Sequence, residues 1–189
     1  SDQASSVMSS EAVPIKPHRI LKEIRQVLGE KDILVADTGQ MAAWTGVLYP
    51  LTAPGRTYIR AAGTLGWSLP AAIGAKFAVG PRKVLDVTGD GGVAYHISEL
   101  ETALRNDKPF VAVVFNNVTL GMLHYGFKWR GEGKALRSSD FVDVDYGRVA
   151  EAFNCYGQRI DRPGELMEAI QSAFASGKPA VIDVLIDRY

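Results

Sequence analysis

Apolar residues spaced three and four positions apart recur along the chain and indicate a series of helices. In the first, the apolar positions share one helical face from Pro17 until Gly29, a residue type that commonly ends helices. Another is rich in small residues and carries Pro70 in its first turn, where the missing N–H of proline is tolerated. This spacing predicts helices at residues 17–28, 68–79, 97–106, 146–153 and 166–174.

Short runs of consecutive apolar residues alternate with these helices. The runs are DILVAD (32–37), residues 57–60, KVLDVTGD (83–90), PFVAVVF (109–115) and AVIDVLI (180–186). Strands buried on both faces are apolar throughout, whereas half-exposed strands alternate between apolar and polar residues. The pattern therefore predicts an α/β fold of three layers, in which helices cover both faces of a doubly wound, mainly parallel sheet.

Two segments break this alternation. Residues 1–14 are small, polar and rich in serine and do not begin with Met, so we expect a linker or a cut end there and a single domain at 15–189. Residues 126–141 (GFKWRGEGKALRSSDF) are charged and contain glycine, which is typical of a long connection that is functional or mobile.

The composition argues against several classes of protein. Lys and Arg together number 21, and so do Asp and Glu, so the chain lacks the positive charge of a nucleic-acid surface or a polybasic membrane patch. No apolar run reaches the length of a membrane span, and no signal-peptide pattern occurs. The single cysteine, Cys155, rules out an internal disulfide framework. We therefore expect a soluble, cytoplasmic protein.

Polar and glycine-rich residues follow three of the predicted strands directly. These sets are Asp37-Thr-Gly-Gln40, Gly89-Asp-Gly-Gly92 and Asn116-Asn117. In open parallel sheets, ligands bind beyond the carboxyl ends of the strands. We therefore expect the three sets to converge on one edge of the sheet and to form a binding site there.

The GDGG sequence that begins at Gly89 has the character of a phosphate site. It lies at a strand-to-helix junction, where backbone N–H groups favour a phosphate and glycines allow close approach. The Asp90 carboxylate would repel a phosphate unless a divalent cation lay between them, and Asn117 offers that cation an amide oxygen. A plain turn is the alternative interpretation of Asp-Gly taken alone.

The motif GDG followed by a double Asn is similar to the thiamine-diphosphate-binding motif of a known enzyme family. In that family, which includes acetolactate synthase, benzoylformate decarboxylase and pyruvate decarboxylase, the spacing resembles that between Asp90 and Asn117 (117 − 90 = 27). DTGQMAAW (37–44), GTLGWSLPAAIGA (63–75) and NNVTLGML (116–123) resemble acetolactate synthase segments in the same order. The resemblance covers nearly all of residues 15–189.

The resemblance implies a role for each matched residue. It implies that Asp90 and Asn117 give side-chain oxygens to Mg²⁺ and that Thr119 gives its backbone carbonyl. It implies that Leu65 supports the bent form of the cofactor and that Gly63 accepts a hydrogen bond from the aminopyrimidine. The remaining residues implied to contact thiamine diphosphate are Gly39, Gln40, Gly89, Gly91, Gly92, Asn117, Gly121 and Met122.

The resemblance also implies that part of the enzyme is absent from this sequence. The cofactor carries the chemistry on a 2-oxo acid, and in the family it is activated by a glutamate on a separate pyrimidine-binding domain. No such domain occurs here, so we expect no catalytic residue in this chain and no activity from it alone. The expected partners are a pyrimidine-binding domain or subunit, a 2-oxo acid and further copies of the chain, and a flavin in a middle domain is left open.

Several positions differ from acetolactate synthase and bear on the substrate. Met41 replaces a histidine, Gly92 replaces a serine, and Gly126 replaces a tryptophan that lines the substrate pocket of the family. We therefore expect a different 2-oxo acid or acceptor. His124 lies near the expected substrate edge and is either a proton donor or a helix histidine that only bonds a neighbour.

Two other functions stay open at the level of the sequence. The chain could be a free-standing subunit that pairs with a separate pyrimidine-binding subunit, as in some sulfopyruvate or phosphonopyruvate decarboxylases. It could also be a non-catalytic α/β module that binds a phosphate or a nucleotide.

Overall fold

Six strands are found in the part of the chain that the structure describes. A computed structural model gives residues 8–55, 57–60, 62–131 and 136–188, and all structural statements refer to these ranges. The expected linker at residues 1–14 and the expected connection at 126–141 thus lie partly outside them. The strands are β1 (Ile33–Ala36), β2 (Tyr58–Arg60), β3 (Val84–Gly89), β4 (Val111–Asn116), β5 (Tyr156–Ile160) and β6 (Ala180–Leu185).

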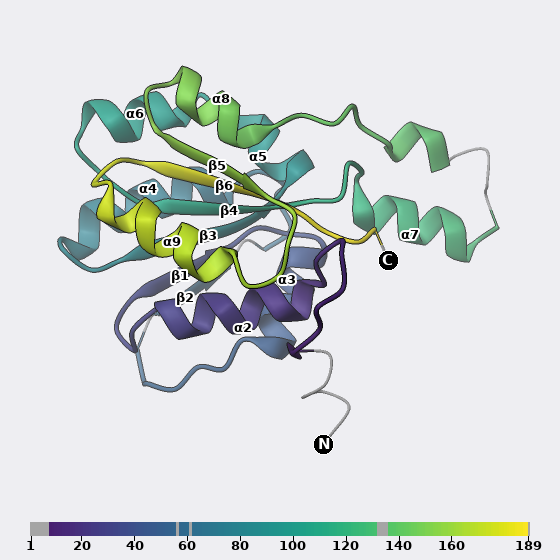
Figure 1. Cartoon of the computed structure of the whole chain (residues 1–189), viewed down its shortest axis with the longest axis horizontal. Coiled ribbons are helices and arrows are strands. Elements are labelled where there is room, and N and C mark those ends of the chain that lie inside the picture. Colours follow the sequence, from purple (N-terminus) through teal and green to yellow (C-terminus); the bar gives the residue numbers. More distant parts are fainter. Residues whose placement is uncertain (1–7, 56, 61, 132–135, 189) are drawn as a thin grey trace.

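The strands form one parallel sheet in the order β2-β1-β3-β4-β6-β5. Helices pack on both faces of this sheet (Figure 1). One face is covered by α2 (Pro17–Val27), α3 (Gln40–Leu48) and α9 (Leu166–Ala175). The other is covered by α4 (Ser68–Val79), α5 (Asp90–His96), α6 (Glu99–Arg105) and α8 (Tyr146–Ala152). The predicted three-layer, doubly wound fold is confirmed.

The hydrophobic core consists of two clusters, one on each face of the sheet. Successive strand residues point to opposite faces, so Leu34 and Leu85 pack in one cluster and Val35 and Val84 in the other. All four side chains are fully buried. Burial on both faces explains why these strands are continuous apolar runs in the sequence.

The edge strand β5 was not predicted from the sequence. Its sequence, YGQRI, is not apolar, and four of its five residues are half-buried because one side of an edge strand is open. Charged residues are common on edge strands, since they discourage pairing with another sheet. Residues 121–129 form a helix, α7 (Gly121–Trp129), so the segment expected to be a connection from residue 126 begins inside a helix.

The order of the strands creates a crevice at one edge of the sheet. From β1 the chain passes to β2 on one side, then returns to β3 on the other side of β1. The connections after β1 and β3 therefore diverge, which leaves a ligand-sized opening at their carboxyl ends. Helix α7 and the short helix η1 (Leu136–Ser139) extend beyond this edge (Figure 1). Within the described ranges, every helix is too short or too polar to traverse a bilayer.

Helix α8 and strand β5 meet through two glycines. A Cβ atom on Gly157 would overlap the carbonyl group of Gly147, and one on Gly147 would lie 2.9 Å from the backbone of Gln158. Backbone atoms cannot move aside as the end of a flexible side chain can. The close contact between these two elements therefore requires glycine at both positions.

We predict that Gly157→Ala destabilises the fold by about 1–3 kcal/mol, the range typical of overpacking. Gly74→Ala is the matched control, because Gly74 lies on the exposed side of α4 with no atom within 4 Å of its missing Cβ. That change should be neutral or should stabilise by up to about 1 kcal/mol, since alanine favours helix. Urea denaturation measures both, and equal stability of the two variants would contradict the expected contact.

Candidate cofactor-binding site

A cavity of about 410 Å³ lies in the crevice between the ends of β1 and β3. Its wall is made by the segments that follow β1, β3 and β4, with one residue from the segment before α4. Eleven of the residues expected in the site line this cavity: Gly39, Gln40, Leu65, Gly89, Asp90, Gly91, Gly92, Asn117, Thr119, Gly121 and Met122. Strand ends far apart in the sequence thus meet at one place.

Two expected site residues lie outside the cavity wall. Gly63 is exposed on the segment after β2, with a φ of +128°. His124 is 5% exposed on α7, and its Nδ1 atom lies 3.3 Å from the Ser139 hydroxyl and 3.5 Å from the Thr119 hydroxyl. The imidazole thus joins α7 to η1 behind the cavity wall, which favours the bonding role over the proton-donor role.

Asp90 connects the loops that follow β3 and β4. Its Oδ1 atom accepts a hydrogen bond from the Gly91 N–H at 2.8 Å, and its Oδ2 atom accepts one from the Thr119 N–H at 3.0 Å. Burial raises the pKa of Asp90 to about 6, although these backbone N–H groups act in the opposite direction. A cation beside this carboxylate would favour its ionised form.

Glycines bring the parts of the wall into close contact. A Cβ atom on Gly92 would overlap the Asp37 carboxylate, so this position requires glycine here. A Cβ atom on Gly121 would overlap the Gln40 amide and lie 2.9 Å from the Asn117 amide nitrogen. Gly121 therefore lets two amide side chains meet at the start of α7.

The donor set of the wall suits a hard cation that shares its ligands with a phosphate. Asp90 offers a carboxylate, Asn117 an amide oxygen and Thr119 a backbone carbonyl, all on one cavity. Within the described ranges, no group of three or more His, Cys, Asp or Glu side chains could hold a metal ion. Mg²⁺ commonly takes few protein ligands and completes its octahedron with phosphate oxygens and water.

Asp37 holds the end of β1 in place, a role that the sequence did not reveal. It is 0% exposed and accepts hydrogen bonds from the Thr38 N–H at 2.8 Å, the Gly66 N–H at 2.9 Å and the Thr88 hydroxyl at 3.2 Å. Burial raises the pKa of this carboxyl, and the three donors counteract that rise. The carboxyl thereby joins β1, the segment before α4 and β3 behind the cavity.

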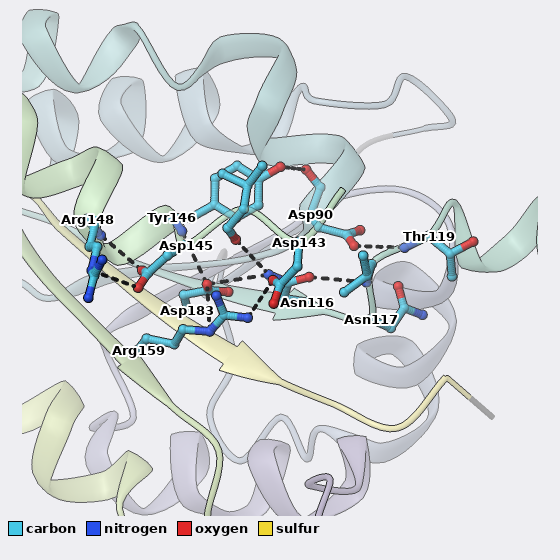
Figure 2. A network of polar contacts seen from close by, with 12 residues as sticks. Asp90, Asn116, Asn117, Thr119, Asp143, Asp145, Tyr146, Arg148, Arg159 and Asp183 are labelled. Atoms are coloured by element: carbon cyan, nitrogen blue, oxygen red, sulfur yellow. Dashed lines mark hydrogen bonds and ion pairs between the residues drawn. The ribbon is translucent and has the colours of Figure 1, made fainter. Parts of the chain in front are cut away.

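The two adjacent asparagines at the end of β4 have different roles. Asn117 lines the cavity, whereas Asn116 does not, and its side chain lies beside Asp183 (Figure 2). The Asn116 Oδ1 atom accepts from the Val118 N–H at 3.1 Å, and its Nδ2 atom donates to the Val144 carbonyl at 3.1 Å. Asn116 therefore fixes the turn on which Asn117 is presented.

Asp183, in the middle of β6, supports both loops from behind (Figure 2). Its Oδ2 atom accepts from the Tyr146 N–H at 3.2 Å and from the Asn116 Nδ2 at 3.4 Å, and the Arg159 Nε lies 3.6 Å away. The Tyr146 hydroxyl in turn donates to the Asp90 backbone carbonyl at 3.0 Å. Burial, with the charges of Asp90 and Asp183, raises the pKa of Tyr146 to about 12, so this hydroxyl keeps its proton.

Sequence reasoning missed Asp183 and Tyr146, although the sequence held a signal for one of them. A carboxyl group in the middle of the buried run AVIDVLI must find donors or lose free energy. The signal marks Asp183 as a structured position, but not which residues donate to it. Tyr146 gives no such signal, because a tyrosine on the apolar face of a helix is common.

Val118 adopts a backbone conformation that is unfavourable for a β-branched residue. Its φ is +57°, in the left-handed region. The conformation is held by the hydrogen bond from its N–H to Asn116 and by one from the Phe141 N–H to its carbonyl at 3.0 Å. Such strain persists only where the surroundings impose it, and here it lies between two residues of the cavity wall.

Residues 37–184 match the family described as "Thiamine pyrophosphate enzyme, C-terminal TPP binding domain". The chain belongs to this family. Thiamine diphosphate, also called thiamine pyrophosphate, is therefore the cofactor for which the domain is named, and the family expected from the sequence is confirmed.

Acetolactate synthases are among the relatives of this TPP-binding domain. It is 33% identical over 192 residues to "Probable acetolactate synthase large subunit" of Methanocaldococcus jannaschii. This alignment covers 96% of this chain and 32% of that protein. It is 32% identical over 172 residues to "Acetolactate synthase" of Bacillus subtilis. That alignment covers 90% of this chain and 30% of that protein. The chain thus spans about a third of the length of these relatives.

A solved structure shares the fold. Benzoylformate decarboxylase from Polynucleobacter necessarius superposes with a TM-score of 0.84 at 23% identity, over 94% of this chain and 34% of that one. At this identity the match shows a common fold.

We predict that Asp183→Asn removes part of the pH dependence of stability. Burial raises the pKa of Asp183 to about 6, against the Asn116 hydrogen bond and the Arg159 charge. A carboxyl whose pKa is higher in the folded state binds a proton on folding. Its contribution to the free energy of unfolding is therefore lost as the pH rises from about 4 to about 6. The stability difference between wild type and variant should change by up to about 3 kcal/mol over this range. Urea denaturation across the range measures it, and a difference that does not vary with pH would contradict the assignment.

We predict that Val118→Asn stabilises the metal-free chain by about 1 kcal/mol, because asparagine tolerates the left-handed conformation better than a β-branched residue. Val142→Asn is the control, since Val142 is 84% exposed and lies outside the left-handed region. That variant should leave the stability unchanged. Thermal unfolding of both variants tests the expectation, which fails if Val118→Asn is no more stable than the control.

Proposed function

We propose that this domain forms the diphosphate- and Mg²⁺-binding part of the active site of a thiamine-diphosphate-dependent enzyme acting on 2-oxo acids. The observation that carries the proposal is that Asp90, Asn117 and Thr119 line one cavity at the switch point of the sheet. Membership of the TPP-binding family and similarity to acetolactate synthases support it. The reaction class is that of a decarboxylase or a carboligase.

The wall residues that the family resemblance singled out divide into metal ligands and residues that contact the cofactor. Asp90 and Asn117 hold Mg²⁺ through side-chain oxygens, and Thr119 does so through its carbonyl. Gly92 and Gln40 offer donors to the diphosphate, while the Gly91 N–H is donated to Asp90 in this structure.

The other expected contacts lie around the same wall. Gly39, Gly89, Gly121 and Met122 border the cofactor, and Leu65 lies at the mouth of the cavity, where it supports the bent form. Gly63, on the exposed segment before Leu65, accepts from the aminopyrimidine. When bound, thiamine diphosphate supplies a carbon nucleophile and an electron sink for the bond next to the 2-oxo group.

The proton acceptor that activates the cofactor is proposed to come from outside this domain. No glutamate is among the described residues that line the cavity. Tyr95, Met122 and Leu123 lie on its rim with 66%, 56% and 51% of their surface exposed. An exposed apolar rim next to a polar cavity suits a docking protein surface, here a pyrimidine-binding domain that carries the glutamate.

The substrate is proposed to differ from that of acetolactate synthase. Gly126 lies one turn of α7 after Met122, so both positions share the face of the helix that borders the cavity. A Cβ atom on Gly126 would lie 3.7 Å from the nearest atom, on Arg130, so the position is open. The absence of a large side chain leaves room for a different 2-oxo acid or acceptor.

We predict that Asp90→Ala abolishes Mg²⁺-dependent retention of thiamine diphosphate in the protein that carries this chain. Partners outside the ligand shell commonly contribute about 10- to 100-fold in metal affinity, so loss of a charged ligand should cost at least about 100-fold. Asp161→Ala is the control, because the Asp161 side chain is 62% exposed and its nearest cation, Arg162, lies 3.9 Å away. Isothermal titration with thiamine diphosphate, with and without Mg²⁺, measures both variants.

Two results would overturn the proposal. One is wild-type cofactor affinity in Asp90→Ala, which would exclude the metal ligand. The other is binding of nucleotides without Mg²⁺ and without competition from thiamine diphosphate, which would favour a non-catalytic binding module.

A further inference from the structure

Arg188 reaches the loop after β4 from the segment that follows β6. Its Nε atom donates to the Asn117 carbonyl at 2.9 Å, and its Nη2 atom donates to the Val118 carbonyl at 3.1 Å. Its Nη1 atom lies 3.4 Å from the Asp140 Oδ1. One side chain thus contacts two successive peptide groups of the cavity wall and a carboxylate that orients it.

The two hydrogen bonds fix the orientation of the peptide planes on either side of Val118. A guanidinium is planar and presents its donors in a rigid fork, so two successive carbonyls bound by one fork cannot rotate independently. The preceding residue of the loop is Asn117, and the following one is Thr119. The geometry of both proposed ligands therefore depends on the peptide groups that Arg188 holds.

Within the described residues, other contacts also support the loop, and the Thr119 hydroxyl donates to the Ser139 carbonyl at 2.9 Å. Asn116 connects it to the buried Asp183, and the Thr119 N–H is bonded to Asp90. The Phe141 N–H donates to the Val118 carbonyl, which Arg188 also binds. Loss of the Arg188 side chain would leave these contacts in place and remove the two hydrogen bonds to the Asn117 and Val118 carbonyls.

We propose that Arg188 is a positioning residue that holds the Asn117–Thr119 loop in the conformation that binds Mg²⁺. The inference rests on the proposed function, because it assumes that this loop supplies metal ligands. Arg188 itself does not line the cavity, so its proposed role is to orient the ligands without binding metal or cofactor.

Electrostatics alone would give the opposite effect. A guanidinium close to the loop repels a divalent cation, although its 37% exposed side chain is partly screened by solvent. Removing that charge should therefore strengthen Mg²⁺ binding if charge were its only contribution. Weaker binding after its removal can come only from lost positioning, so the sign of the change separates the two effects.

The test compares Arg188→Ala and Arg188→Lys with the control Arg162→Ala in the protein that carries this chain. The Arg162 side chain is 75% exposed and its nearest carboxylate lies 3.9 Å away. Titration of Mg²⁺ at saturating thiamine diphosphate should show about 10- to 100-fold weaker metal binding for Arg188→Ala, as for other residues that orient metal ligands. Arg188→Lys should fall between this variant and wild type, because an ammonium keeps the charge without the fork.

A second measurement needs neither metal nor cofactor. Hydrogen exchange of the Thr119 and Leu120 amides should be about tenfold faster in Arg188→Ala than in wild type, since their bonds to the Asp90 carboxylate and the Ser139 carbonyl open more often when the loop is loosened. In the control Arg162→Ala, the same two amides should exchange at the wild-type rate. Should Arg188→Ala fail to fold, Arg188→Lys, which removes the fork but keeps the charge, should show the same changes to a smaller degree.

Unchanged or stronger Mg²⁺ binding together with unchanged amide exchange in Arg188→Ala would overturn the inference. So would a loss of Mg²⁺ affinity that Arg162→Ala shows to the same extent. If the wild type itself bound no Mg²⁺ with thiamine diphosphate, the proposed function would fail. The exchange measurement would still show whether Arg188 holds the loop.

Discussion

The hydrogen bond from the Thr119 backbone N–H to the Asp90 carboxylate joins the loops after β3 and β4, and the shape of the cavity depends on it. Behind these loops, Tyr146 fixes the Asp90 carbonyl and Asn116 fixes the turn after β4, and both donate to Asp183. Asp183 belongs to β6, which pairs with β4 along its whole length. The register of paired strands, more than the preference of any loop, therefore sets the distances across the proposed metal site.

The buried carboxyl groups and the strained loop around the cavity lower the stability of the folded chain. Burial raises the pKa of Asp37, Asp90 and Asp183, so ionising each of these carboxyl groups costs more free energy in the folded chain than in the unfolded one. Val118 adds a strained backbone. A cation and a cofactor that bind only the folded chain would offset these costs by mass action. The site thus concentrates unfavourable terms that the apolar sheet on either side must outweigh.

The sequence was sufficient for the fold class and for the strand ends that meet at the cavity, for a physical reason, whereas Leu65, Gly121 and Met122 were expected from the family resemblance alone. Strands buried on both faces must be apolar, and the ends of parallel strands meet at one edge, so runs such as PFVAVVF locate both core and site. The strand at 156–160 escaped notice because an edge strand need not be apolar. The supports of the site, Asp183 and Arg188, escaped because their partners lie 67 and 71 residues away, and no local pattern encodes such a contact.

The supports also connect the site to the completion of the fold. The proposed ligands come from the ends of β3 and β4, but the groups that orient them come from β6 and from the segment after β6. In the sheet, β6 lies between β4 and β5, so it can insert only where β5 leaves room for it. Before β6 pairs, Asn116 lacks its bond to Asp183, and the carbonyls of Asn117 and Val118 lack Arg188, so the strained loop depends on its remaining bonds, such as those of Val118 with Asn116 and Phe141. The support of the ligand loop is therefore complete only once β6 has paired.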